Sequence, residues 1–176
     1  MRQFLLGVIL AVIVVVIALP LGAILYIRSG NVPVATTAPP FPMERTLAQT
    51  ALKARIARDA PKSSPVPATP ENLMEGAKLY REYCSVCHGV KGAAPSPTAL
   101  GMNPPPPQLF QKKGVTDDPV GETYWKVSNG IRLTGMPGYG QSLSSTQLWQ
   151  VCQMLANANH LEPGTEALLA AEPQEK

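Results

Sequence analysis

The sequence predicts an all-α protein in which one long apolar helix precedes a small helical domain. Three observations support this prediction: an uncharged run of 23 mostly apolar residues near the start, helical spacing of apolar residues in later segments, and a C-x-x-C-H motif. With 176 residues, 19 prolines and only 6% aromatic residues, the chain is too short for a large multi-domain enzyme.

The apolar run, Leu5–Ile27, predicts a transmembrane anchor at residues 1–28. At about 1.5 Å per residue it reaches about 34 Å, which is enough to cross the ~30 Å hydrocarbon core of a bilayer. A cleaved signal peptide is the alternative, but the candidate cleavage sites, at Ala23 inside the run and at Ala38 after it, do not suit a signal peptidase. Because Arg2 and Arg28 flank the run on both sides, the positive-inside rule leaves its orientation open.

Residues 29–70 are predicted to be a Pro-rich linker, because they contain eight of the nineteen prolines. Within this linker, residues 43–60 lack Pro and Gly and predict a short basic helix. The residues leave three roles open for this helix: it lies on anionic lipid headgroups, packs on its own domain, or acts as a solvated spacer. At the other end of the chain, residues 162–176 are polar-rich and are predicted to be a flexible tail.

The basic charge of the chain lies outside the predicted domain. The net charge is +3, yet residues 1–70 hold seven Lys or Arg against two Asp or Glu, whereas residues 71–176 hold eight against ten. A nucleic-acid-binding protein concentrates its positive charge on the folded domain. The charge distribution therefore predicts no nucleic-acid partner.

The segment Cys84-Ser85-Val86-Cys87-His88 is the motif that carries chemistry. Its two thiols lie one helical turn apart and can add to the two vinyl groups of a haem, after which the adjacent histidine can bind the iron. The alternatives are a zinc half-site, which needs a second pair of ligands, and a redox C-x-x-C, which needs a thioredoxin-like context. The odd number of cysteines, three, argues against a disulfide framework. The motif therefore predicts one covalent haem c with its iron.

With this motif, residues 71–161 resemble a class I c-type cytochrome domain of the single-haem, membrane-anchored type, related to the cytochrome subunits of bacterial oxidases and dehydrogenases. Gly76 and Tyr80, eight and four residues before Cys84, match the family's small and aromatic positions where the first helix crosses the last. The loop Gly135-Met136-Pro137 matches the loop of the distal ligand. The resemblance implies a cytochrome c-like domain of three to four helices around one covalent haem.

The resemblance implies that His88 is the proximal iron ligand and Met136 the distal one. Met102 and His160 are the alternatives for the distal position, together with an open site. Met136 is preferred because the proline after it restricts its loop. In the family a proline carbonyl accepts a hydrogen bond from the proximal histidine, which implies one of Pro104–Pro107 without indicating which. The cofactor-binding residues implied are Cys84, Cys87, His88 and Met136, with His88 and Met136 as the metal ligands.

Two further helices are expected in the domain. Asp118-Pro119 has the residue types of an N-cap and first-turn pair for a short helix. On that helix, Tyr124 and Trp125 are expected in the wall of the haem pocket, in the core, or on a partner surface. Ser144–Asn157 is expected to be the closing helix. In it, Met154 replaces an aromatic residue common in the family, which is expected to weaken the helix crossing unless Trp149 compensates.

A haem iron with histidine and methionine ligands has no vacant site, so it transfers single electrons and performs no bond chemistry. The resemblance therefore implies an electron carrier, not an enzyme, between respiratory or periplasmic redox partners. The apolar run predicts a single-pass anchor in the inner-membrane lipid bilayer, and attachment of haem after export, which the resemblance implies, places the haem domain on the periplasmic side. Two alternatives are a dedicated subunit of a larger membrane oxidoreductase complex and a haem-based sensor with a labile sixth site.

Overall fold

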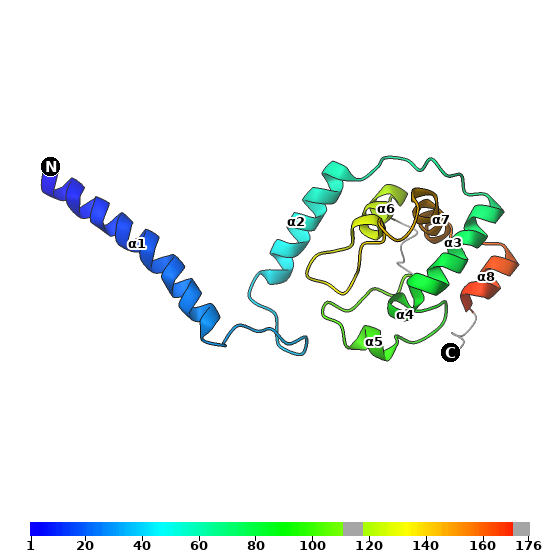
Figure 1. Cartoon of the computed structure of the whole chain (residues 1–176), viewed down its shortest axis with the longest axis horizontal. Helices are drawn as coiled ribbons and strands as arrows, with labels where there is room; N and C mark the ends of the chain where they lie inside the picture. Colours follow the sequence, from blue (N-terminus) through cyan, green and yellow to red (C-terminus); the bar gives the residue numbers. More distant parts are fainter. Residues whose placement is uncertain (111–117, 171–176) are drawn as a thin grey trace. The chain divides into compact units, whose positions relative to one another are not determined.

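The structure is a computed structural model that describes residues 1–110 and 118–170. Across these residues it contains helices and no strand, so the predicted all-α fold is confirmed. Contacts divide the chain into two units, Met1–Pro42 and Met43–Lys176. Figure 1 follows the helices of both units along the sequence, from blue at the N-terminus to red near the C-terminus.

The first unit consists mainly of helix α1, Arg2–Arg28, in which no residue is buried. Its length and apolar composition suffice to cross a membrane, although a signal sequence near an N-terminus meets the same criteria. Helix α1 is therefore a candidate membrane span. In its last turn, the ring of Tyr26 meets the ring of Phe41, which follows the helix, edge to face with centroids 6.0 Å apart.

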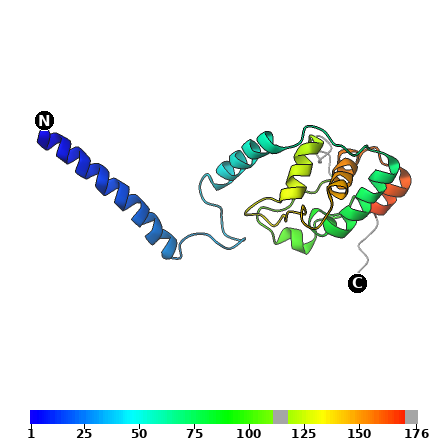
Figure 2. The same ribbon diagram turned by 45° about the horizontal axis from the view of Figure 1, so that its top comes forward.

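The core of the second unit forms where helix α3, Pro70–Tyr83, crosses helix α7, Ser145–Ala156. Figures 1 and 2 both show α3 and α7 side by side. The residue before each helix caps it with its side chain, Thr69 for α3 and Ser144 for α7, and so satisfies a backbone N–H of the first turn. The largest fully buried side chains come from α3, α7 and a later helix: Tyr80, Leu148, Met154, Leu169, Val151 and Cys152.

Gly76 determines how closely α3 and α7 approach each other. A Cβ at this position would overlap the carbonyl oxygen of Gln150 and lie 2.9 Å from the Cβ of Met154. One turn later, the Tyr80 hydroxyl donates a hydrogen bond of 2.6 Å to the carbonyl oxygen of Gly89. Met154 is fully buried, so it packs at the crossing that we expected it to weaken.

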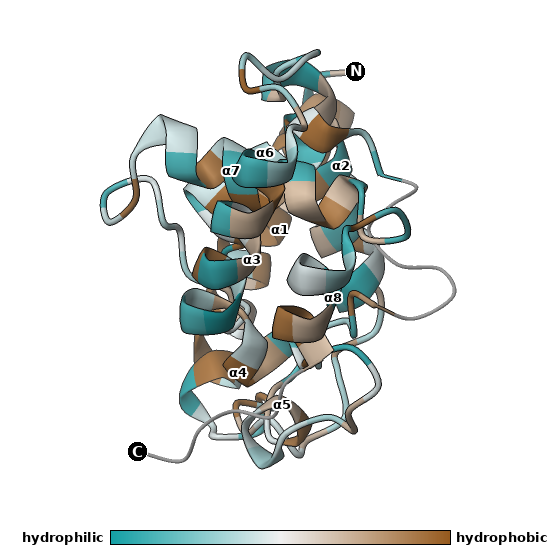
Figure 3. Cartoon of the chain, turned by 90° about the vertical axis from the view of Figure 1, so that its right-hand side faces the viewer, coloured by the Kyte–Doolittle hydropathy of each residue, from teal (hydrophilic) through white to brown (hydrophobic). Residues whose placement is uncertain are grey.

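Helix α8, Pro163–Ala170, occupies part of the predicted flexible tail. Thr165 and Leu169, one turn apart, are both buried, and α8 packs on α3. Figure 3 shows hydrophobic residues, in brown, on α8. The flexible tail predicted at 162–176 is therefore wrong for Pro163–Ala170. Two buried positions hold this helix, which is too short to show a clear apolar period in the sequence. Residues 171–176 lie outside the described residues.

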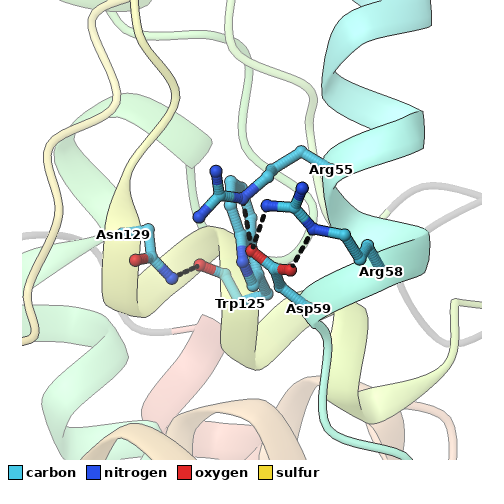
Figure 4. A network of polar contacts seen from close by, with 5 residues as sticks. All are labelled: Arg55, Arg58, Asp59, Trp125 and Asn129. Carbon is cyan, nitrogen blue, oxygen red and sulfur yellow. Dashed lines mark hydrogen bonds and ion pairs between the residues drawn. The ribbon is translucent and has the colours of Figure 1, made fainter.

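Helix α2, Glu44–Asp59, packs on helix α6, Val120–Asn129, within the second unit. Ile56 of α2 is only 4% exposed. Of the three roles that the sequence left open for this helix, the structure shows packing on its own domain. Figure 4 shows the polar edge of the contact, where Arg55 and Arg58 both bind the carboxylate of Asp59 beside Trp125 of α6.

The chain between α2 and α3 is also attached to the domain. The side chain of Gln153 in α7 donates a hydrogen bond of 2.8 Å to the carbonyl oxygen of Val66. A Cβ at Gly121 in α6 would overlap the carbonyl oxygen of Pro61 and lie 2.8 Å from its carbonyl carbon. Residues 43–69, which we call the N-terminal arm, therefore lie against the domain and depend on a glycine for part of that contact.

Replacing Gly121 with alanine is expected to release the N-terminal arm and leave the α3–α7 core folded. The added methyl group must displace backbone at Pro61, which costs about 1.4 kcal/mol or more and raises the population of the open arm roughly tenfold. Trypsin should then cleave at the basic residues of α2 about ten times faster. Gly101→Ala is the control, because a Cβ there meets its nearest neighbour at 3.6 Å. Equal cleavage rates for the two variants would contradict the prediction.

Candidate functional site

The C-x-x-C-H motif forms a turn of its own directly after α3. Cys84 ends α3, and helix α4, Ser85–His88, follows it. The backbone N–H groups of Cys87 and His88 both donate to the Cys84 carbonyl oxygen, at 3.2 and 2.9 Å. This turn places the two thiols one helical turn apart. Burial raises the pKa of the Cys84 thiol to about 12, with a smaller contribution from Cys87.

The His88 ring is held by one hydrogen bond. Its Nδ1 lies 2.8 Å from the carbonyl oxygen of Pro107. A carbonyl oxygen can only accept, so Nδ1 carries the proton and Nε2 has its lone pair free for a metal. Burial lowers the pKa of His88, partly opposed by the bond to Pro107, which favours the neutral imidazole that ligation requires. The sequence implied one of Pro104–Pro107 as the acceptor, and the structure identifies Pro107.

A cavity of about 320 Å³ opens beside the motif. Cys84, Cys87 and His88 line it together with Met136. The structure thus gathers the four predicted site residues on the wall of one cavity. Most of the remaining wall is apolar and includes Val127 from α6 and Val151 and Leu155 from α7.

The loop that carries Met136 is fixed by hydrogen bonds and by glycines. The Met136 N–H donates to the Thr134 hydroxyl oxygen at 3.1 Å, and that hydroxyl donates to the Ile131 carbonyl oxygen at 2.7 Å. Where the loop leaves α6, Gly130 has φ +70, and a Cβ there would lie 2.5 Å from the backbone nitrogen of Gly138. Only glycine adopts this conformation at this spacing without strain. The backbone on both sides of Met136 is therefore fixed.

The alternative distal ligands occupy different places. Met102 lines the same cavity, and its Sδ would lie 2.9 Å from a Cβ at Gly135, so it touches the loop of Met136. His160 is exposed beyond the end of α7 and is not part of the cavity wall. Met136 also packs against the buried core. These positions favour Met136 and retain Met102 as its competitor.

Two tyrosines of the cavity wall were missed by sequence reasoning. The Tyr139 hydroxyl donates a hydrogen bond of 2.8 Å to the Tyr83 carbonyl oxygen, and the two rings meet edge to face at 5.8 Å. Their closeness in sequence to predicted site residues could have indicated them, since Tyr83 precedes Cys84 and Tyr139 lies three residues after Met136. Tyr124 instead stacks on Trp149 in the core at 4.0 Å, and Trp125 lies beside α2, so neither lines the cavity.

A small helical domain that gathers two cysteines, a histidine and a methionine around an apolar cavity has the arrangement of a c-type cytochrome. Residues 71–153, just under half of the chain, match the family model described as cytochrome C oxidase, cbb3-type, subunit III. This segment is a c-type cytochrome domain related to oxidase subunits, and the resemblance inferred from the motif is confirmed. The chain matches no curated protein.

The residues of the cavity fit the covalent haem that a c-type cytochrome domain carries. Cys84 and Cys87 are free thiols, the His88 Nε2 is available, and a methionine thioether lines the same space. The Nε2 of Gln108, also in the wall, is buried and finds no hydrogen-bond partner within the described residues. A buried donor of this kind suits a cavity that receives a group with polar substituents.

Proposed function

We propose that the protein is a membrane-anchored monohaem c-type cytochrome that transfers single electrons between respiratory or periplasmic redox partners. The gathering of the four predicted site residues on one cavity wall, inside a c-type cytochrome domain, carries this proposal. The apolar helix α1 supports a single-pass anchor in the inner membrane. Haem attachment after export, which the resemblance implies, supports a periplasmic haem domain.

Each site residue has one role in this proposal. Cys84 and Cys87 form the thioether links, and the His88 Nε2 and the Met136 Sδ bind the iron. When bound, the haem supplies an iron that gains or loses one electron, with no open position for other chemistry. Pro107 fixes the orientation of the imidazole. The apolar wall limits water near the site and thereby favours the less charged, reduced state.

A dedicated subunit of a larger membrane oxidoreductase complex is the second candidate function. The match to a family described as an oxidase subunit favours it. Mild detergent extraction of tagged chain from its native membrane separates the two candidates. Co-purification of partner proteins at a fixed stoichiometry indicates a subunit, whereas a chain that purifies alone and exchanges electrons with several partners indicates a carrier.

The test of the proposed function uses the full chain purified from the membranes of cells that attach haem c. We expect one haem per chain to remain bound after denaturation, and the reduced protein to ignore carbon monoxide. We also expect one reactive thiol in the denatured chain and none in the folded chain, because Cys152 is buried and burial raises its pKa to about 12. Extractable haem, or three reactive thiols, would overturn the proposal. Ready binding of carbon monoxide would favour a haem sensor instead.

Replacing Thr134 with valine is expected to weaken ligation by Met136. Valine keeps the shape of the side chain but removes the hydroxyl, which accepts from the Met136 N–H and donates to the Ile131 carbonyl. Losing this link costs about 1.4 kcal/mol, so imidazole should displace the methionine from the oxidised protein with roughly tenfold higher affinity. Thr134→Ser retains the hydroxyl and should bind imidazole like the wild type. Unchanged imidazole affinity in Thr134→Val would show that the hydroxyl does not hold the loop.

A further inference from the structure

Lys126 is the lysine that lines the cavity, within the part of the chain that the structure describes. It extends from α6, three residues after Thr123 and next to Val127, which also line the cavity. Its Nζ lies 3.0 Å from Oδ2 of Asp118, another residue of the wall. The side chain of Lys126 is 26% exposed and that of Asp118 is 46% exposed. A cation and a carboxylate thus stand together in the wall of a cavity that is otherwise mostly apolar.

This ion pair has no clear role in building the fold. Asp118 was expected to cap α6, but the helix begins after Pro119 without a side-chain cap, and the Asp118 carboxylate turns to Lys126 instead. A partly exposed ion pair contributes about 0–1 kcal/mol to stability. The ion pair therefore adds little to folding stability, and its position in the cavity wall points to a role in binding.

The Lys126 ammonium group has a possible partner in haem, because haem carries two propionate groups. A carboxylate that enters an apolar cavity is costly unless a charged or hydrogen-bonding partner meets it. The Lys126 ammonium has three N–H donors and accepts nothing, so it can bind Asp118 and a second carboxylate at the same time. We propose that Lys126 binds a propionate of the haem, with Asp118 orienting the ammonium group as a shared acceptor. This inference rests on the proposed function of the same cavity.

The proposal has an electrostatic consequence for the redox equilibrium. The oxidised iron site carries one more positive charge than the reduced site, so a nearby cation favours reduction and a nearby carboxylate favours oxidation. Lys126→Gln should therefore lower the midpoint potential, and Asp118→Asn should raise it. We expect each change to alter the electron-transfer equilibrium constant roughly three- to tenfold, since both groups are partly exposed to solvent.

The experiment measures midpoint potentials of the full-length protein in detergent, with covalent haem content checked first. Lys126→Arg should keep the wild-type potential. Lys78→Gln is the matched control, because Lys78 also forms an ion pair, with Glu75, but lies exposed on α3 outside the cavity wall. Wild-type protein without covalent haem would refute the proposed function itself. Normal haem content with unchanged potentials in Lys126→Gln and Asp118→Asn would overturn this inference alone.

A second measurement separates contact from long-range charge. Haem labelled with ¹³C at its propionate carboxyl groups identifies those groups in redox-difference infrared spectra. We expect the labelled carboxylate bands to shift in Lys126→Gln and to stay in place in Lys78→Gln. A potential that falls while the labelled bands stay in place would overturn the proposed contact.

Discussion

Replacing Met136 with alanine is expected to open the iron to external ligands. The loop around Met136 is fixed by Thr134 and by the close backbone approach at Gly130, so removal of the thioether leaves space that the loop cannot easily fill. The oxidised protein should lose the weak sulfur-to-iron charge-transfer band at the red end of the spectrum. The reduced variant should bind carbon monoxide to saturation, whereas the wild type is expected to ignore it. The midpoint potential should fall, because methionine ligation raises it.

Met102→Ala is the matched control for this prediction, because Met102 lines the same cavity. It should keep the charge-transfer band and remain indifferent to carbon monoxide. The opposite pattern, with Met102→Ala losing the band and Met136→Ala keeping it, would assign the distal ligand to Met102. Loss of the band in both variants would show that the two loops depend on each other, as their contact at Gly135 allows.

Replacing Gly76 with alanine is expected to destabilise the domain by about 3 kcal/mol or more, despite the better helix propensity of alanine. The added methyl group would overlap the Gln150 carbonyl oxygen and lie 2.9 Å from the Met154 Cβ. The two helices must then separate along the contact that forms most of the core. Thermal unfolding followed by circular dichroism should show a melting temperature lower by roughly 10–20 °C.

Gly164→Ala supplies the comparison, since Gly164 is also helical but a Cβ there meets only the Met74 Cε, at 3.7 Å. That variant should be unchanged or more stable by up to about 1 kcal/mol, because alanine favours the helix. Similar melting temperatures for Gly76→Ala and wild type would mean that α3 and α7 can move apart without loss of packing.

The parts of the fold that follow strong local rules could be predicted from the sequence. The run Leu5–Ile27 indicates its helix by 23 uncharged, mostly apolar residues, and apolar residues at helical spacing indicate the closing helix. Gly76 and Tyr80 were recognised by their distance from the C-x-x-C-H motif. These features depend on residues that are close together in the sequence, so local sequence patterns can predict them.

The parts that depend on distant contacts could not be predicted. Helix α8 is held by Thr165 and Leu169 against α3, and the sequence gives no sign that this short segment has a partner. Four consecutive prolines offered equivalent carbonyl oxygens, and only the path of the loop selects Pro107. Asp118 was expected to cap a helix, but its carboxylate instead accepts from Lys126, eight residues later.

Packing of α2 on the haem domain shortens the flexible linker between that domain and the proposed anchor. The sequence suggested a linker of 42 residues at 29–70, whereas only 15 residues separate α1 from α2. If all 42 residues were flexible, the root-mean-square reach of the linker would be about 36 Å, whereas 15 flexible residues reach about 21 Å. A shorter flexible linker confines the domain to a smaller volume. Compared with 42 flexible residues, 15 raise its local concentration near a membrane-bound partner roughly fivefold. Releasing the arm, as in Gly121→Ala, would therefore slow electron exchange with a nearby partner while leaving the haem site unchanged.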